Sequence, residues 1–131
     1  MRESLYNRDV VLWVEDTVAK LQSRDFGNLD LEKLITELED WGSSQRNGAR
    51  GLLRRLLEHS LKSCYVPLPG YYLGWQREIR NFRKDLQDLL ADSPSLKHFL
   101  QEILRQTYTR ARATVREDYS QINFPDVNPT F

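Results

Sequence analysis

Apolar residues recur along this chain at intervals of three and four, the spacing that places side chains on one face of an α-helix. The first such run predicts a helix over residues 11–21. We expect Gly27, which tolerates left-handed backbone, at the C′ position that ends it. A second helix is predicted over residues 30–41, with Asp30 as its N-cap and a break or bend at Gly42.

The third predicted helix, over residues 43–65, has the widest apolar face. Its members are Ala49, Leu52, Leu53, Leu56, Leu57, Ser60 and Cys64. A face this wide predicts the central and most buried helix, with Cys64 as a small buried apolar residue. Gly48 and Gly51 are poor helix formers. Either they allow close contact with another helix, or the helix begins only after Gly51.

Proline and glycine in residues 66–70 end the third helix, and a fourth is predicted over residues 75–90. Residues 91–95 form the next boundary, and a fifth helix follows over residues 96–115. The tail has no helical period. We expect it to be extended and to lie back on the protein through Phe124 or Phe131.

The predicted fold class is therefore all-α: a compact bundle of about five helices with an extended C-terminal tail. No alternation typical of strands is present. The length of 131 residues suits a single all-helical domain over 1–131. Short loops predict that successive helices are antiparallel neighbours.

Composition limits the kinds of site and the cellular compartments that we expect for this protein. The single cysteine, Cys64, rules out an intramolecular disulfide and a cysteine-rich zinc site. The N-terminus is charged from its second residue, so we expect no secretory signal. No run approaches the ~20 apolar residues that span a membrane. We expect a cytoplasmic protein that does not associate with membranes.

Three segments together resemble a known family. They are LDLEKLITELEDWG, RLLEHSLKSCYVP and GWQREIRNFRKDLQDLLADSPSLK, followed by Phe124-Pro125 and Pro129 near the end of the chain. Their order and spacing resemble the bacterial family known as domain of unknown function 29, which is common in cyanobacteria. Ser60 departs from it, since the family usually has leucine there. The resemblance implies an all-helical fold and supplies no catalytic residue or cofactor.

Charge is unevenly distributed, although the formal net charge is zero. Residues 1–42 hold five Lys/Arg against ten Asp/Glu, or −5, and residues 43–117 hold fourteen against seven, or +7. Acidic and basic helices that pack side by side would explain this pattern. The alternative is a bipolar surface that steers a charged partner.

The strongest candidate for chemistry lies on the third predicted helix. Arg55, His59 and Lys62 fall along one strip beside the apolar face. Two cations would lower the pKa of His59, leaving a neutral imidazole able to bind an anion or act as a base. The competing interpretation is a hydrogen bond across a helix interface, to Glu37 or Glu39.

A pocket that united Glu37, His59, Lys62 and Trp75 would favour a ligand or catalysis. The complete candidate set is Glu37, Arg55, His59, Lys62, Trp75 and Arg80. With two histidines and no metal-ligand spacing, no metal site is predicted, and no cofactor or phosphate-loop motif is present.

The sequence leaves the function unknown and favours a non-enzymatic protein-interaction or regulatory module. Its partner would be an unidentified protein or a second copy in a homodimer. The alternative is nucleic-acid binding through the basic helices 77–84 and 105–116. Zero net charge argues against that alternative without excluding a local basic patch. The third hypothesis is an enzyme or ligand binder around His59.

Overall fold

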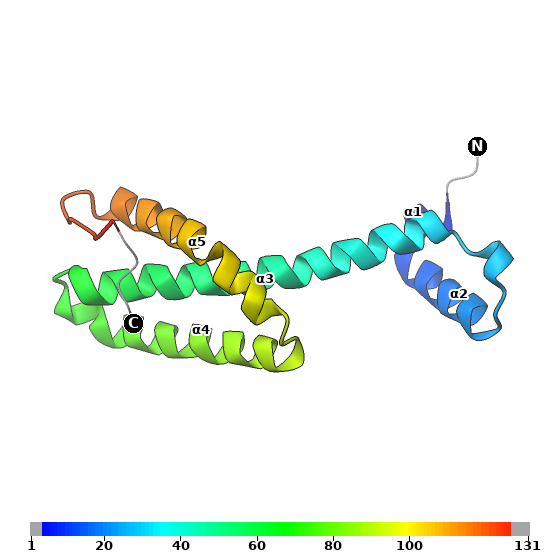
Figure 1. Ribbon diagram of the computed structural model, residues 1–131, viewed down its shortest axis with the longest axis horizontal. Helices are drawn as coiled ribbons and strands as arrows, with labels where there is room; N and C mark the ends of the chain where they lie inside the picture. Colours follow the sequence, from blue (N-terminus) through cyan, green and yellow to red (C-terminus); the bar gives the residue numbers. More distant parts are fainter. Residues whose placement is uncertain (1–3, 127–131) are drawn as a thin grey trace. The chain divides into compact units, whose positions relative to one another are not determined.

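A computed structural model describes residues 4–126, which form helices joined by short loops (Figure 1). The helices are α1 (Leu5–Arg8), α2 (Val10–Gln22), α3 (Leu31–Tyr65), α4 (Tyr72–Asp92) and α5 (Leu96–Asp118). Two 3-10 turns are present, η1 (Phe26–Asn28) and η2 (Pro69–Tyr71). No strand occurs within the described residues, and the predicted all-α fold class is confirmed.

The five helices are not the five that were predicted, because α3 runs unbroken through Gly42. A helix-interior glycine costs only about 1 kcal/mol relative to alanine and leaves the backbone hydrogen bonds intact, so it need not end a helix. The predicted N-cap is confirmed, since the Lys33 amide donates to Asp30 Oδ1 over 3.1 Å. The short α1, capped by Ser4, was not predicted.

Contacts within the chain define two compact units, Met1–Gly42 and Ser43–Phe131, and α3 contributes residues to both. We refer to them as the N-terminal and C-terminal units and describe each by itself. The single domain expected from the length remains a prediction.

The N-terminal unit has a very small interior. The Tyr6 ring meets Trp13 edge-to-face, with 5.4 Å between ring centroids. Lys33 Nζ lies over the same tyrosine ring, 3.6 Å from its centroid. Among the described residues of this unit, only Trp13 and Thr17 are buried.

Arg24, and not Gly27, takes the left-handed position after α2, with a φ of 59°. The Asp25 amide donates to the Lys20 carbonyl over 2.8 Å and the Arg24 amide to the Leu21 carbonyl over 3.2 Å. These two bonds form a Schellman cap, so the predicted role of Gly27 as the C′ residue is wrong. Gly27 instead lies within η1.

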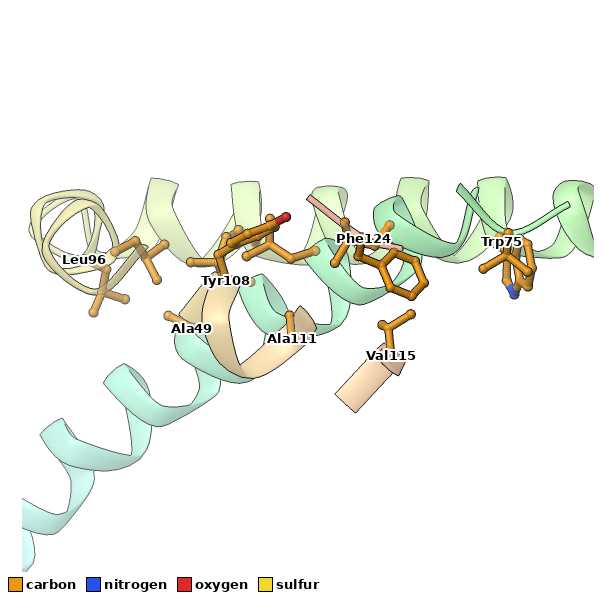
Figure 2. Packing of buried hydrophobic residues seen from close by; sticks show 13 residues of the cluster. Ala49, Trp75, Leu96, Tyr108, Ala111, Val115 and Phe124 are labelled. Carbon is orange, nitrogen blue, oxygen red and sulfur yellow. The ribbon is translucent and has the colours of Figure 1, made fainter. Parts of the chain in front are cut away.

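The C-terminal unit holds the core. In Figure 2 the labelled side chains of α3, α4, α5 and the tail gather in one apolar cluster. Helix α3 buries Ala49, Leu53, Leu57 and Leu61, whereas α5 buries Leu96, Leu100, Thr107, Tyr108, Ala111 and Val115. The most buried helix is therefore α5. The wide apolar face predicted for this part of α3 includes Leu52 and Leu56, which are only partly buried and pack against the border of the cluster.

The segment after α5 folds back onto this core. Phe124 is 2% exposed, as one of the two predicted anchors requires. The Tyr108 hydroxyl donates to the Pro125 carbonyl over 2.7 Å, and Arg112 Nε and Nη2 each donate to the Phe124 carbonyl over 3.2 Å. The other predicted anchor, Phe131, lies outside the described residues.

Cys64 is exposed, so its predicted burial is wrong. Periodicity places it on the apolar face of α3, but it lies in the last turn of the helix, at the edge of the core. The chain leaves the helix after Tyr65, and Val66 fills the core instead, with 1% exposure.

Candidate functional site

His59 lies half-buried between α3 and α4. Its Nδ1 is 2.8 Å from the Arg55 carbonyl oxygen, one turn earlier in the same helix. Because a carbonyl only accepts, Nδ1 carries the hydrogen, and Nε2 is the acceptor of the neutral ring. The imidazole packs edge-on against Phe82 of α4, with 5.1 Å between ring centroids. The predicted interhelical contact of His59 is thus with an aromatic ring and not with Glu37 or Glu39.

Burial is the largest cause that lowers the pKa of His59 below its usual value, and the Lys62 charge lowers it further. The hydrogen bond to Arg55 raises the pKa, as do Glu78 and Glu58. The lowered pKa agrees with the sequence analysis, which attributed it to two cations. In the structure, Arg55 opposes the shift through its backbone carbonyl.

The other residues of the strip pack on aromatic rings of α4. Lys62 Nζ lies 5.8 Å from the ring centroid of Trp75, and the Arg55 guanidinium lies 5.7 Å from that of Phe82. Cation–π contacts of this kind stabilise helix pairs. Trp75 itself is buried, whereas Arg80 is exposed on α4.

Glu37 belongs to the N-terminal unit, while the other five candidates belong to the C-terminal unit. The Glu37 carboxylate lies 3.9 Å from Lys33 Nζ. Hydrogen bonding to Glu37 is the largest cause that raises the pKa of Tyr6. These contacts give Glu37 a structural role within its own unit. A chemical role shared with His59 remains a prediction.

The N-terminal unit exposes large apolar residues on two helices, which was not predicted from the sequence. The exposed members on α2 are Val10, Val11, Leu12, Val14, Val18 and Leu21, and those on the first part of α3 are Leu31, Ile35, Leu38 and Trp41. Exposure reaches 63% at Val11, 60% at Leu38 and 67% at Trp41. Helical periodicity revealed both stripes but not whether another element covers them.

A basic cavity in the C-terminal unit was also missed. It has a volume of about 380 Å³ and is lined by Asn47, Arg50, Gly51, Arg54, Thr107 and Arg110. Arg50 and Arg54 are one turn apart on α3, a signal visible in the sequence. Their approach to Arg110 on α5 depends on how the two helices pack.

Across residues 4–126, no three His, Cys, Asp or Glu side chains are grouped so that they could hold a metal ion. Among the described helices, none is both long enough and apolar enough to cross a membrane.

The described residues thus form an all-helical protein. Its N-terminal unit exposes apolar residues, and its C-terminal unit contains the hydrophobic core. Its sequence matches the family model of domain of unknown function DUF29 over residues 5–131, and the chain belongs to that family. The predicted membership is therefore confirmed. A search of curated proteins found no match, and neither did a search of solved structures.

Proposed function

We propose that this protein is a non-enzymatic interaction module that self-associates through the apolar stripes of its N-terminal unit. The observation that carries this proposal is that the N-terminal unit has few buried residues and many exposed apolar side chains. That unit buries two residues and leaves ten large apolar ones on α2 and α3 exposed. An exposed apolar surface of this extent is typical of protein-binding sites.

Helical geometry gathers most of these residues into stripes. At 3.6 residues per turn, five of the α2 residues fall within an arc of about 100°. These are Val10, Val11, Val14, Val18 and Leu21, and they flank the buried Trp13 and Thr17. On α3, Leu31, Ile35 and Leu38 share one arc with Trp41 at its edge. Such stripes suit helix-to-helix packing with a partner.

The exposed area of the two stripes, taken together, is comparable with one partner's share of a standard interface. The nine stripe residues are about half exposed, which amounts to roughly 900 Å², against about 800 Å² per partner in a standard interface. A second copy carries the same stripes, so two copies can pair about a twofold axis with the same surface on each. The acidic residues beside the stripes then lie at the rim, where water and salt screen them.

The small interior gives a second reason for a partner. The N-terminal unit, Met1–Gly42, is close to the size of about 40 residues below which domains usually need disulfides, metals or oligomerisation. The N-terminal unit contains no cysteine, because Cys64 belongs to the C-terminal unit. Pairing would bury the surface that its own helices leave exposed.

Sedimentation equilibrium of the full chain over a range of concentrations tests this proposal. We expect reversible dimerisation that Leu38→Ser weakens at least tenfold, because it removes an apolar contact from the stripe. The matched control is Leu73→Ser, the same change at a leucine of α4 that is 70% exposed in the other unit. A chain that stays monomeric throughout, or equal losses in both variants, would refute self-association through the stripes.

A second candidate function, nucleic-acid binding, is supported by the side chains of α4. Arg77, Arg80, Arg83 and Lys84 are all exposed, and the helical angle places them within an arc of about 120°. Glu78 and Asp85 fall on the opposite side of the apolar face, whereas Asp88 lies at the edge of the basic arc. In this proposal the later basic residues, 105–116, would add phosphate contacts.

Fluorescence anisotropy with labelled single- and double-stranded DNA at low salt tests this second candidate. We expect salt-sensitive binding that Arg80→Glu weakens and Lys97→Glu, a charge reversal on α5, leaves unchanged.

We also propose that the protein is bacterial and cytoplasmic and that its helices are arranged as a bundle.

A further inference from the structure

The cavity between α3 and α5 has a basic lining. Its lining combines three arginines with Asn47, Gly51 and Thr107, and includes no carboxylate. Its volume of about 380 Å³ lies within the range of small-molecule sites, about 300–1,000 Å³. The whole cavity belongs to the C-terminal unit, whereas the stripes proposed to mediate self-association belong to the N-terminal unit.

One arginine of the cavity is held in place before any ligand arrives. The Arg50 guanidinium lies over the Phe99 ring, 5.5 Å from its centroid. Its Nη1 also lies 3.4 Å from Asn47 Oδ1. A guanidinium fixed in this way loses less conformational freedom when it binds an anion.

The charges do not cancel within the cavity. Arg54 Nε lies 3.5 Å from Glu58 Oε1, which leaves the terminal nitrogens of Arg54 free to donate. Arg50 and Arg110 form no ion pair with any carboxylate of residues 4–126. Three cations against the single Glu58 carboxylate leave a local charge of +2. That charge matches a phosphate dianion, whose oxygens arginine binds in bidentate geometry.

Gly51 gives an independent reason to regard the cavity as a binding site. Glycine is unfavourable inside a helix, and the close helix contact predicted for Gly48 and Gly51 is absent. A Cβ at Gly48 would meet nothing within 4 Å, and one at Gly51 would meet only Arg55 Nη2, at 3.3 Å. Packing therefore does not require glycine at either position. Gly51 does line the cavity, where a side chain would occupy space.

We propose that this cavity binds a dianionic phosphate group, either free or carried by a small molecule, through Arg50, Arg54 and Arg110. Thr107 forms part of the wall and donates its hydroxyl to the Ile103 carbonyl over 2.8 Å, so it is not a free donor. A polynucleotide is the less suitable occupant, because it requires an open row of cations and not one cavity.

An NMR titration of the ¹⁵N-labelled full chain tests the proposal. The ligands are inorganic phosphate and glucose 6-phosphate, with sodium chloride at matched ionic strength as the reference. We expect saturable shifts of the Gly51 amide with phosphate and none with chloride. Tighter binding of the ester would identify a phosphorylated molecule as the source, and equal binding would identify free phosphate.

Two pairs of variants separate the cavity from general surface charge. Arg110→Gln should weaken phosphate binding about tenfold, whereas Arg83→Gln on the exposed side of α4 should change it less than twofold. Gly51→Ala should weaken binding while the protein stays helical, and Gly48→Ala should leave binding unchanged. Equal losses in either pair would overturn the proposal. The proposal would also be overturned if oligothymidine bound more tightly than phosphate and both arginine variants weakened that binding equally. Dimerisation would be unaffected in every case.

Discussion

Phe124 anchors the tail to the C-terminal unit, and its replacement by alanine measures how much the tail contributes to stability. The side chain is 2% exposed and its ring meets Tyr65 edge-on, with 6.2 Å between centroids. Transfer of a buried phenylalanine side chain accounts for about 1.5–3 kcal/mol, and an unfilled cavity raises the total to 3–5 kcal/mol. The tail can move into part of the space, so we expect a loss of about 3 kcal/mol for Phe124→Ala.

Urea unfolding monitored by Trp75 fluorescence is the appropriate assay. Trp75 lies in the core of the C-terminal unit, and replacing Trp13 and Trp41 by phenylalanine leaves it as the only tryptophan. The matched control is Phe26→Ala in the same background, because Phe26 is 54% exposed and should change the midpoint little. A loss below about 1 kcal/mol for Phe124→Ala would show that the tail is not part of the core.

Three other substitutions test local features of the fold. Arg24→Gly should stabilise the N-terminal unit by about 0.5–1 kcal/mol in thermal unfolding, because glycine tolerates a φ of 59°; destabilisation would contradict the Schellman cap. Gly42→Ala should raise stability by a similar amount, about 0.5–1 kcal/mol, since α3 is continuous and nothing lies within 4 Å of the added Cβ; a loss of helix by circular dichroism would indicate a real break. His59→Gln should remove a pH dependence of the free energy of unfolding. Because the pKa of His59 is lowered in the folded state, His59 contributes stability above its usual pKa of about 6.5, and this stability is lost as the pH falls toward the folded value. Identical pH profiles for the variant and the wild type would refute that assignment.

The fold class followed from periodicity because repeats of three and four residues define a helix face wherever they occur. Helix ends were harder to predict. Gly42 and Gly27 both resembled stop signals, yet neither ends a helix. The backbone at Gly42 stays helical because an interior glycine costs only about 1 kcal/mol relative to alanine and keeps its backbone hydrogen bonds. At the end of α2, Arg24 adopts the left-handed conformation usually left to glycine.

The candidate sites were harder to predict, for the same physical reason in each case. Sequence spacing correctly placed Arg55, His59 and Lys62 along one strip of the helix. It did not show that Phe82 and Trp75 of α4 pack against that strip. The cavity requires side chains of α3 and α5, which are more than fifty positions apart in sequence. Their packing is a tertiary property that a periodic pattern does not contain.

The same limit explains why one apolar pattern has two outcomes in this protein. The stripe of α5 at Leu96, Leu100 and Val115 is buried by α3 and α4, whereas the equally regular stripe of α2 is exposed. Burial contributes to stability only where a second surface excludes water, so an uncovered stripe contributes little to the isolated unit. Substituting a stripe residue such as Leu38 should therefore affect association much more than the stability of the monomer. Substituting Leu100 should have the opposite effect, and this contrast separates residues that maintain the fold from residues that serve a partner.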